Sequence, residues 1–348
     1  MPSLHKNDPK RFIIQICTNG KAPKSVNSIL ETVKSYPLEF PYETWVVAES
    51  YDKNDYGADR VISVPADFAT SNGTGAKARA LEYARQVRLR EDMEDETTKI
   101  LFLDDDSMPE RDYVEYAYHS SFDIGHGFIR TDRTYGANIL TSVADNFRVT
   151  DCMATCPTFA SNGRPKLIHG EGLLARGNVE REITWDWGGA ASWGEDLLFG
   201  TKASHKFKYG FIPFSVHISS PFTVGDLYKQ RRRWLWGSIL SLSELTRTEQ
   251  SFIIARLYCG LMAIPSVALM AYGDVEHIAF PLPFAIVFIS GTFSFVAYYL
   301  IGCWLNTHQV RKVLQTLALF WLASLMEAPI IFFSILSRPR TFEVIRKE

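Results

Sequence analysis

Three short groups of polar residues, in a defined order along the chain, are the parts of this sequence best suited to chemistry. Three adjacent carboxylates, Asp104–Asp106, follow the apolar run Ile100–Leu103. The triplet Gly194–Asp196 comes 90 residues later, and the basic motif Gln230–Trp234 stands just before the chain turns hydrophobic. Each group alone is a weak signal. Their order and spacing together indicate one site built from carboxylates and arginines, close to a membrane.

The three aspartates are suited to binding a divalent cation. Adjacent carboxylates repel one another, so exposing them at a strand end is costly unless a cation offsets the charge. Mg²⁺ and Mn²⁺ take oxygen ligands and bridge readily to phosphates. We expect Asp106 to be a metal ligand and Asp104 to bind the metal or a nucleotide, with Asp105 structural. The alternative is a surface acidic turn, or a helix start, before Pro109.

Glu195 and Asp196 are candidates for general acid–base work. A carboxylate in a partly desolvated pocket has a raised pKa, which suits it to removing a proton from a hydroxyl group. We expect Asp196 to be the base. Glu195 is expected to help bind the molecule whose hydroxyl group Asp196 deprotonates. The alternative is that both are acids favoured by the dipole at the start of a helix.

The motif Gln230–Trp234 could bind both an anion and a ring. An arginine such as Arg233 can neutralise a diphosphate through two parallel hydrogen bonds, and Trp234 offers a flat face for stacking. We expect Gln230 to contribute to the same surface. The alternative is a basic interfacial helix in which the tryptophan anchors the protein at a membrane.

Two further segments hold weaker candidates. Gly73–Arg79 opens an expected helix, whose free N–H groups and Lys77 could serve a phosphate, although the spacing is not that of a P-loop. His169 and Glu171 could position a second substrate. An ordinary helix start and a structural histidine are the respective alternatives.

The elements expected around these residues form an open α/β sheet. We predict strands at Phe12–Cys17, Thr44–Ala48, Arg60–Val64 and Ile100–Leu103, and helices at Ser25–Tyr36 and Gly73–Arg90. This β-α-β alternation predicts parallel strands, and such sheets bind ligands beyond the carboxyl ends of their strands. Thr18 with Asn19, Glu49 and Asp104 all stand at such ends.

Composition excludes a nucleic-acid partner as the main function. The 348 residues include 37 basic and 39 acidic side chains, a net charge of −2, so no global field favours nucleic acid. Five cysteines are odd in number and scattered, which is typical of reduced thiols in a cytosolic setting. Cys152 and Cys156 could begin a zinc site, but no second pair completes four ligands, so we interpret them as structural.

The C-terminal third is hydrophobic. Val224–Arg247 is amphipathic and could lie in a bilayer interface with its basic residues near headgroups. Three apolar segments follow, Phe252–Gly273, Ile278–Leu305 and Val313–Leu336, each longer than the roughly 20 residues that a span needs. A very hydrophobic soluble helical domain is the alternative.

The expected topology depends on the third apolar segment. Residues 1–12 have no signal-peptide pattern, so we expect residues 1–250 to be cytosolic and Gly273–His277 to lie outside. Arg311 and Lys312 then obey the positive-inside tendency. A third full crossing would place the basic tail 337–348 outside. We therefore expect that segment, which contains Glu327 and Pro329, to bend, re-enter or lie in the interface.

Taken together, these motifs resemble those of inverting family-2 glycosyltransferases with a GT-A fold, the group that includes cellulose, chitin and hyaluronan synthases. The family signature is an aspartate at the second strand, then D-x-D, (T/G)-E-D and Q-x-x-R-W. Glu49, Asp104–Asp106, Gly194–Asp196 and Gln230–Trp234 match it in order, with Glu49 in place of the aspartate. The match covers roughly residues 11–237.

Within this group the chain looks most like the egghead β-1,4-mannosyltransferases, which transfer mannose from GDP-mannose to a glucosyl lipid. His169–Arg176, the tryptophan-rich lead into Glu195 and Ser220–Trp234 carry that likeness. The resemblance implies that Asp196 is the base, that Asp106 holds the metal and that Lys77 lies near the diphosphate. It also implies that Gln230, Arg233 and Trp234 frame the acceptor and the leaving group.

The tail adds one more resemblance. Phe342–Lys347 is similar to the F-x-V-T-x-K gating loop of cellulose synthases, which covers the donor site from the cytosolic side. Ile345 replaces the threonine, so only Lys347 is expected to contact the donor. This likeness also favours a cytosolic tail.

The sequence therefore predicts an integral membrane glycosyltransferase whose catalytic domain faces the cytosol. We expect a GT-A domain (1–220), an interfacial helix (221–250), membrane or interfacial helices (251–336) and a gating tail (337–348). Mg²⁺ or Mn²⁺ is the expected cofactor. The expected partners are a nucleotide-sugar, preferably GDP-mannose but possibly a UDP-sugar, a lipid-linked or glycan acceptor, and membrane lipids.

Three alternatives remain at this stage. A processive synthase using a UDP-sugar would keep the same motifs, although so few membrane segments leave a complete polymer channel doubtful. A non-catalytic module that binds nucleotide-sugars or lipids would need none of the intact carboxylates. A nucleotidyltransferase would leave Gln230–Trp234 without a role and would release pyrophosphate.

Overall fold

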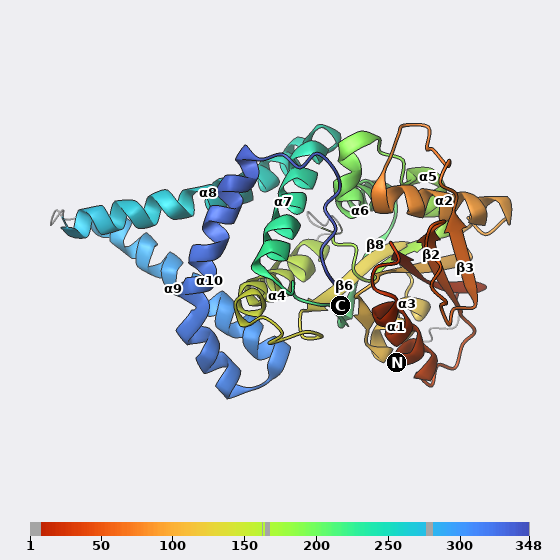
Figure 1. Cartoon of the computed structure of the whole chain (residues 1–348), viewed down its shortest axis with the longest axis horizontal. Helices are drawn as coiled ribbons and strands as arrows, with labels where there is room; N and C mark the ends of the chain where they lie inside the picture. Colours follow the sequence, from red (N-terminus) through yellow and green to blue (C-terminus); the bar gives the residue numbers. More distant parts are fainter. Residues whose placement is uncertain (1–7, 162, 164–167, 276–280, 348) are drawn as a thin grey trace.

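A mixed β-sheet flanked by helices forms one half of the molecule, and four long helices form the other (Figure 1). The computed structural model describes residues 8–161, 163, 168–275 and 281–347. The strands are β1 Arg11–Thr18, β2 Glu43–Glu49, β3 Arg60–Val64, β4 Thr98–Asp104, β5 Met108–Pro109, β6 Ile124–Arg130, β7 Leu173–Arg176 and β8 Tyr209–His217. The helices of the sheet domain are α1 Pro23–Ser35, α2 Ala76–Arg90, α3 Arg111–His119, α4 Ile139–Ala160, α5 Gly177–Ile183 and α6 Glu195–Lys206.

The sheet has the strand order β3-β2-β1-β4-β7-β6-β8-β5. The first four strands are parallel, as predicted. β7 is antiparallel to both β4 and β6, so the sheet as a whole is mixed. The expectation of parallel strands is therefore confirmed for β1 to β4 and also holds for the pair β6 and β8, whereas β7 and β5 run antiparallel to their neighbours. The remaining strands come from residues 107–220, where the sequence shows no regular alternation of strand and helix.

β1 shows why the strands of the N-terminal half could be predicted from the sequence. Phe12, Ile14 and Ile16 pack on one face of the sheet, against the core that includes α1 and α3. Ile13 and Cys17 pack on the other face, against α2 and α5. Side chains alternate between faces along a strand, so a strand covered on both sides reads as a continuous apolar run. This arrangement delivers the carboxyl ends of β1, β2 and β4 to one edge.

Helix α2 begins later than Gly73. Gly73 has φ +72°, and the segment from Thr70 to Gly75 turns before the helix starts at Ala76. Asp186 fixes this turn by accepting hydrogen bonds from the Asn72 N–H (2.9 Å) and the Thr74 hydroxyl (2.6 Å). The first turn of α2, which carries Lys77, is thereby held in place.

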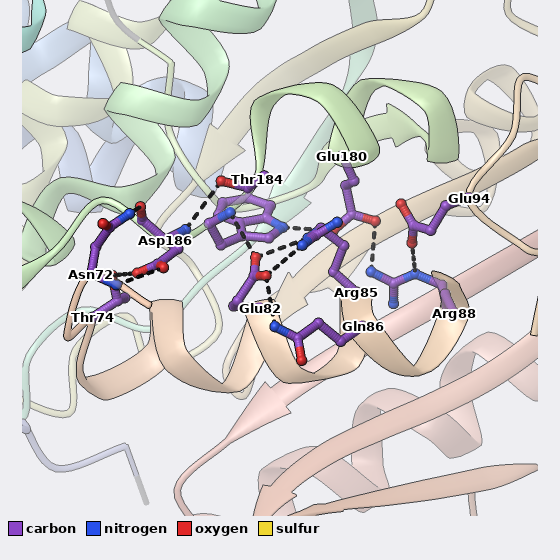
Figure 2. A network of polar contacts seen from close by, with 11 residues as sticks. Asn72, Thr74, Glu82, Arg85, Gln86, Arg88, Glu94, Glu180, Thr184 and Asp186 are labelled. Atoms are coloured by element: carbon purple, nitrogen blue, oxygen red, sulfur yellow. Dashed lines mark hydrogen bonds and ion pairs between the residues drawn. The ribbon is translucent and has the colours of Figure 1, made fainter. Parts of the chain in front are cut away.

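A buried ion network braces α2 against the rest of the domain (Figure 2). Arg88, fully buried, donates to Glu94 (2.7 Å) and to Glu180 of α5 (2.6 Å). It also donates to the amide oxygen of Gln15 on β1. A buried ion pair of this kind stabilises the fold only while both partners are present. Removal of either partner leaves the other charged and unpaired in the interior.

The C-terminal half consists of α7 Val224–Ser241, α8 Arg247–Val275, α9 Leu282–Thr307 and α10 Val310–Leu336. Among the described residues, α9 and α10 are long and apolar enough to cross a membrane, judged by length and composition. Both expose large apolar side chains, among them Phe293 and Phe333. The first expected apolar segment falls within α8, much of which lies outside the side chains that the structure describes, and residues 276–280 lie outside the described chain.

Helix α10 lies beside α7 and α4, which separate it from the sheet (Figure 1). Near its start, Lys312 lies over the Tyr135 ring, 5.7 Å from its centroid. At its middle Glu327 accepts from Arg231 of α7 (2.9 Å). Just beyond its end Ser337 contacts the Tyr228 hydroxyl (2.8 Å). The tail that follows therefore starts beside α7 and reaches the sheet domain at Lys347.

We predict that Arg88→Ala lowers the free energy of unfolding by about 3–5 kcal/mol, because it leaves two buried carboxylates unpaired. For a domain of this size the melting temperature in detergent would fall by roughly 6–20 °C. Lys206→Ala, which removes an exposed ion pair with Glu182, is the control and is expected to leave the melting temperature unchanged. Equal melting temperatures for Arg88→Ala and the unmutated protein would contradict this account.

Candidate active site

A cavity of about 310 Å³ lies where the carboxyl ends of β1, β2 and β4 meet α6, α7 and the C-terminal tail. It is lined by every predicted site residue except His169: Thr18, Asn19, Glu49, Lys77, Asp104, Asp106, Glu171, Glu195, Asp196, Gln230, Arg233, Trp234 and Lys347. The three motifs and the tail, which span more than 240 positions of the sequence, thus converge on one site.

Two lysines neutralise the acidic floor of the cavity. The Lys77 ammonium at the start of α2 lies 2.5 Å from Asp104 and 3.3 Å from Glu195. The Lys347 ammonium bridges Asp105 (2.6 Å) and Asp106 (2.8 Å). Asp105, expected to be only structural, also accepts from the Thr18 hydroxyl (3.3 Å), so it joins β1 to the cluster.

The aspartates differ in their ease of ionisation. Burial opposes ionisation of Asp104, but Lys77 and Lys347 outweigh it and hold the pKa of Asp104 below its ordinary value. Burial, with Asp105 and Asp104 nearby, raises the pKa of Asp106 despite Lys347. Asp106 therefore loses its proton less readily than Asp104, and a cation beside it would favour its ionised form.

These residues fit a divalent cation. The donors at the strand end are all carboxylate oxygens, which are hard ligands of the kind that Mg²⁺ and Mn²⁺ prefer. One ammonium group already lies within 3 Å of two of these carboxylates, so the position suits a compact cation. Asp104 and Asp106 are the residues that would hold it.

Glu195 and Asp196 form the first turn of α6. One Asp196 oxygen accepts from the backbone N–H of Gly170 (2.8 Å), and the other from its neighbour Leu197 (2.8 Å). Burial raises the pKa of Asp196, and Glu171 adds to the shift although Lys77 opposes it. Burial, opposed by Lys77 and reinforced by Asp196, raises the pKa of Glu195 to about 7. Such shifts suit proton transfer near neutral pH.

Helix α7 presents one face of the Gln230–Trp234 motif to the cavity. Thr223 caps its start by accepting from the Asp226 N–H (3.0 Å). Gln230, Arg233 and Trp234 then fall on one side, as helical i, i+3, i+4 spacing requires. The Nε of Arg233 is buried and has no hydrogen-bond partner within the described parts of the chain, so a donor in this cavity remains unused.

The other two arginines of the motif turn to protein groups. Arg231 donates to Asp145 of α4 (2.7 Å) and to Glu327 of α10 (2.9 Å). Arg232 pairs with Glu343 of the tail. We expected basic side chains here to lie near headgroups, whereas these two connect α7 to α4, α10 and the tail.

Glu171 and His169 take different places. Glu171 lines the cavity and pairs with Arg148 of α4, whose guanidinium lies 4.6 Å from the Trp234 ring centroid. His169 stands behind Glu171, with its Nδ1 3.3 Å from that carboxylate. Its Nε2 faces the Cys152 thiol (3.5 Å) instead of the cavity. The structure therefore does not place His169 where it could touch an acceptor directly.

The opposite wall comes from β1 and β2. Glu49 pairs with Arg79 of α2, so its carboxylate is held in the cavity with its charge balanced. Tyr51, which the sequence did not single out, lines the same wall and donates to the Asn19 carbonyl (3.4 Å). Arg148 was missed as well, because it lies in the middle of α4 without any motif around it.

The C-terminal tail closes the cavity. In Figure 1 it passes from the end of α10 across α7 to the sheet. Phe342 lies under Arg233, with the guanidinium 4.7 Å from the ring centroid. Lys347 reaches the aspartates from the far end of the same segment. The expected contact residue of the tail, Lys347, therefore lines the site, and Phe342 does so as well.

Three comparisons bear on the identity of this site. The family model for glycosyl transferase family group 2 matches residues 99–334, more than half of the chain. The β-1,4-mannosyltransferase bre-3 of Caenorhabditis elegans is 27% identical over 90% of this chain and 72% of its own length. The β-1,4-mannosyltransferase egh of Drosophila melanogaster is 27% identical over 65% of this chain, and the match spans about half (52%) of that relative.

A solved structure shares the fold. The mannosyltransferase PcManGT of Pyrobaculum calidifontis, in complex with GDP-mannose and Mn²⁺, superposes with a TM-score of 0.52 at 15% identity. The match covers 95% of this chain and 87% of that one. The GT-A fold predicted from the motifs is thereby confirmed.

The family match, the shared fold and the convergence of the motifs on one cavity agree with each other. The resemblance to family-2 enzymes seen in the sequence is thus confirmed. The chain belongs to glycosyl transferase family group 2 and is a glycosyltransferase.

Proposed function

We propose that this enzyme transfers mannose from GDP-mannose, with inversion, to a hydroxyl group of a membrane glycolipid. The observation that carries the proposal is the cavity in which Asp196, with its raised pKa, shares one site with the Asp104–Asp106 cluster and Arg233. The names of the relatives, both β-1,4-mannosyltransferases, and the GDP-mannose complex of PcManGT support mannose as the sugar.

Asp196 is the group that we assign to the acceptor. Its carboxylate takes the proton of the acceptor hydroxyl as that oxygen attacks the anomeric carbon, and the bond from this carbon to the diphosphate breaks on the opposite face. The Gly170 N–H holds one oxygen of Asp196, which fixes the direction of the carboxylate. A single displacement of this kind inverts the configuration, so an α-linked donor gives a β-linked product.

Positive groups in the same cavity serve the leaving diphosphate. Arg233 offers its unused Nε to a phosphate oxygen. Lys77 and Lys347 supply two ammonium groups, each already within 3 Å of an aspartate. A Mg²⁺ or Mn²⁺ ion held by Asp104 and Asp106 would neutralise charge on the departing GDP.

The tail would have to adjust when a donor binds. Lys347 contacts Asp105 and Asp106, the same carboxylates that a metal and diphosphate would approach. We propose that the tail keeps its Arg232–Glu343 pair and moves the Lys347 ammonium from the carboxylates to the diphosphate. This role corresponds to the gating segment expected from the sequence.

The acceptor is proposed to come from the membrane. The apolar exposed surfaces of α9 and α10 require lipid, since soluble surfaces rarely expose patches of this kind. The start of α10 contacts Tyr135 of the sheet domain, and its end contacts Tyr228 of α7, which supports a helix lying along the interface, with its tail on the side of the catalytic domain. We propose that this side is the cytosol, as the positive-inside tendency suggests.

We predict that Asp196→Asn lowers kcat for mannosyl transfer by about 10²–10⁴-fold, because the general base is removed. Binding of GDP-mannose, measured by thermal shift, should remain, since the amide keeps the size of the side chain. Asp151→Asn, which alters an ion pair with Arg256, is the matched control and should keep full activity. Product formation by Asp196→Asn at the rate of the unmutated enzyme would remove the mechanism.

A panel of donors tests the sugar and the cofactor together. GDP-mannose with Mn²⁺ should raise the melting temperature, in line with a gain of about 2.7 kcal/mol at about 100 times Kd. UDP-glucose and UDP-N-acetylglucosamine with Mn²⁺ should do so much less. In Asp106→Asn the added effect of Mn²⁺ should disappear. Stabilisation by UDP-sugars alone would overturn the mannosyl proposal and favour a UDP-sugar synthase.

A further inference from the structure

Behind the active site, four metal-ligating side chains from three separate segments meet. His126 lies on β6, Cys152 and Cys156 on α4, and His169 on the segment before β7. One ligand atom each from His126, Cys156 and His169 lies within 4.8 Å of the other two. Cys152 adds a thiol 3.5 Å from the His169 Nε2. The sequence shows only the cysteine pair, because the fold brings in both histidines from positions far from α4.

From this geometry we propose that the protein holds a structural Zn²⁺ ion between His126, Cys156 and His169, with Cys152 as the fourth ligand. This site is separate from the cavity of the aspartates and does not depend on the proposed sugar. Two thiolates and two imidazoles form one of the standard tetrahedral zinc donor sets. Binding would release the protons of the two thiols to solvent.

The separations between the ligand atoms are close to those of a tetrahedral zinc site, so small side-chain movements would complete it. With metal–ligand bonds of about 2.0–2.3 Å, the ligand atoms of a tetrahedral site lie about 3.3–3.8 Å apart. The Cys152–His169 separation already falls in that range, at 3.5 Å. The ligand atoms of His126, Cys156 and His169, which lie within 4.8 Å of one another, need to approach by about an ångström, and the Cys152 thiol would have to turn from His169 toward the same point. Cys152 and Cys156 share a helix face because they are four residues apart.

Both histidines are oriented as zinc ligands usually are. The His126 Nδ1 contacts the Tyr209 hydroxyl (2.9 Å), while its Nε2 is buried and has no hydrogen-bond partner among the described residues. The His169 Nδ1 faces the Glu171 carboxylate (3.3 Å), while its Nε2 faces a thiol. Zinc-ligating histidines commonly direct the second ring nitrogen to a hydroxyl, carboxylate or carbonyl oxygen. An unpaired buried nitrogen aimed into the cluster is costly without a ligand.

The environment favours zinc over the cation of the active site. His126, Cys152 and Cys156 are each at most 5% exposed. Thiolate and imidazole are borderline to soft ligands that select zinc, whereas Mg²⁺ and Mn²⁺ prefer carboxylate oxygens. A zinc ion here would tie β6 and α4 to the segment carrying Gly170 and Glu171, and so would help fix the N–H that holds Asp196.

The test is the metal content and ligand set of the purified full chain. Protein purified without chelator and exchanged into buffer with Mg²⁺ should retain about one zinc per chain by mass spectrometry. X-ray absorption at the zinc edge should show two sulfur and two nitrogen ligands, at about 2.3 and 2.0 Å. Neither measurement requires activity, so a failed mannosyl assay would leave the result standing.

Matched variants separate this site from adventitious binding. Cys156→Ser and His126→Asn should each lower the zinc content at least fivefold, whereas Cys303→Ser, a buried thiol on α9, should keep it. If the two variants do not fold, absorption data on the unmutated protein decide alone. Less than about 0.1 zinc per chain, zinc with oxygen ligands only, or equal zinc in all variants would overturn the proposal.

Discussion

The crowding of carboxylates at the strand edge is the constraint on which the rest of this structure depends. Asp104, Asp105 and Asp106 end β4 within reach of Glu195 and Asp196, in a largely buried cavity. Like charges at this distance cannot all ionise without cations beside them. The protein supplies Lys77 and Lys347. The same imbalance suits the proposed metal ion, which would in turn bind the anionic diphosphate, so the feature that makes the cavity costly would also serve the proposed reaction.

Much of the surrounding architecture holds those cations in position. Lys77 stands at the start of α2, a helix pinned at its first turn by Asp186 and at its last by Arg88. Lys347 arrives on a tail that is attached to α7 through the Arg232–Glu343 pair. Helix α7 in turn is joined to α4 and α10 through Arg231. The apolar helices are thereby coupled to the catalytic cavity, which suits an enzyme whose acceptor comes from a membrane.

The parts of this picture that sequence could predict are those carried by local patterns. β1 to β4 were readable because strands buried on both faces appear as short apolar runs. The cavity residues of the three motifs could be predicted because adjacent carboxylates and a basic, aromatic segment rarely occur in the same sequence. Strands β6 to β8, of which β7 runs antiparallel to its neighbours, could not be predicted, since residues 107–220 mix aromatic, glycine and polar residues without a period.

The misses have a common physical cause. Arg148, Tyr51 and the second half of the cysteine–histidine cluster act through contacts between residues distant in sequence. His126 reads as an ordinary strand residue until β6 is placed beside α4, and His169 was assigned to the acceptor because it precedes Glu171. The turn at Gly170 sends the two side chains to different sides, Glu171 into the cavity and His169 toward the thiols.

The stereochemistry and leaving group of the reaction test the central claim most directly. Purified enzyme would be given GDP-mannose, Mn²⁺ and a glucosyl lipid, with the anomeric proton of the product followed by NMR and the released nucleotide identified. A β-linked mannosyl lipid, with one GDP released per sugar transferred, is the predicted result. An α-linked product, or release of pyrophosphate instead of GDP, would contradict a single displacement driven by Asp196.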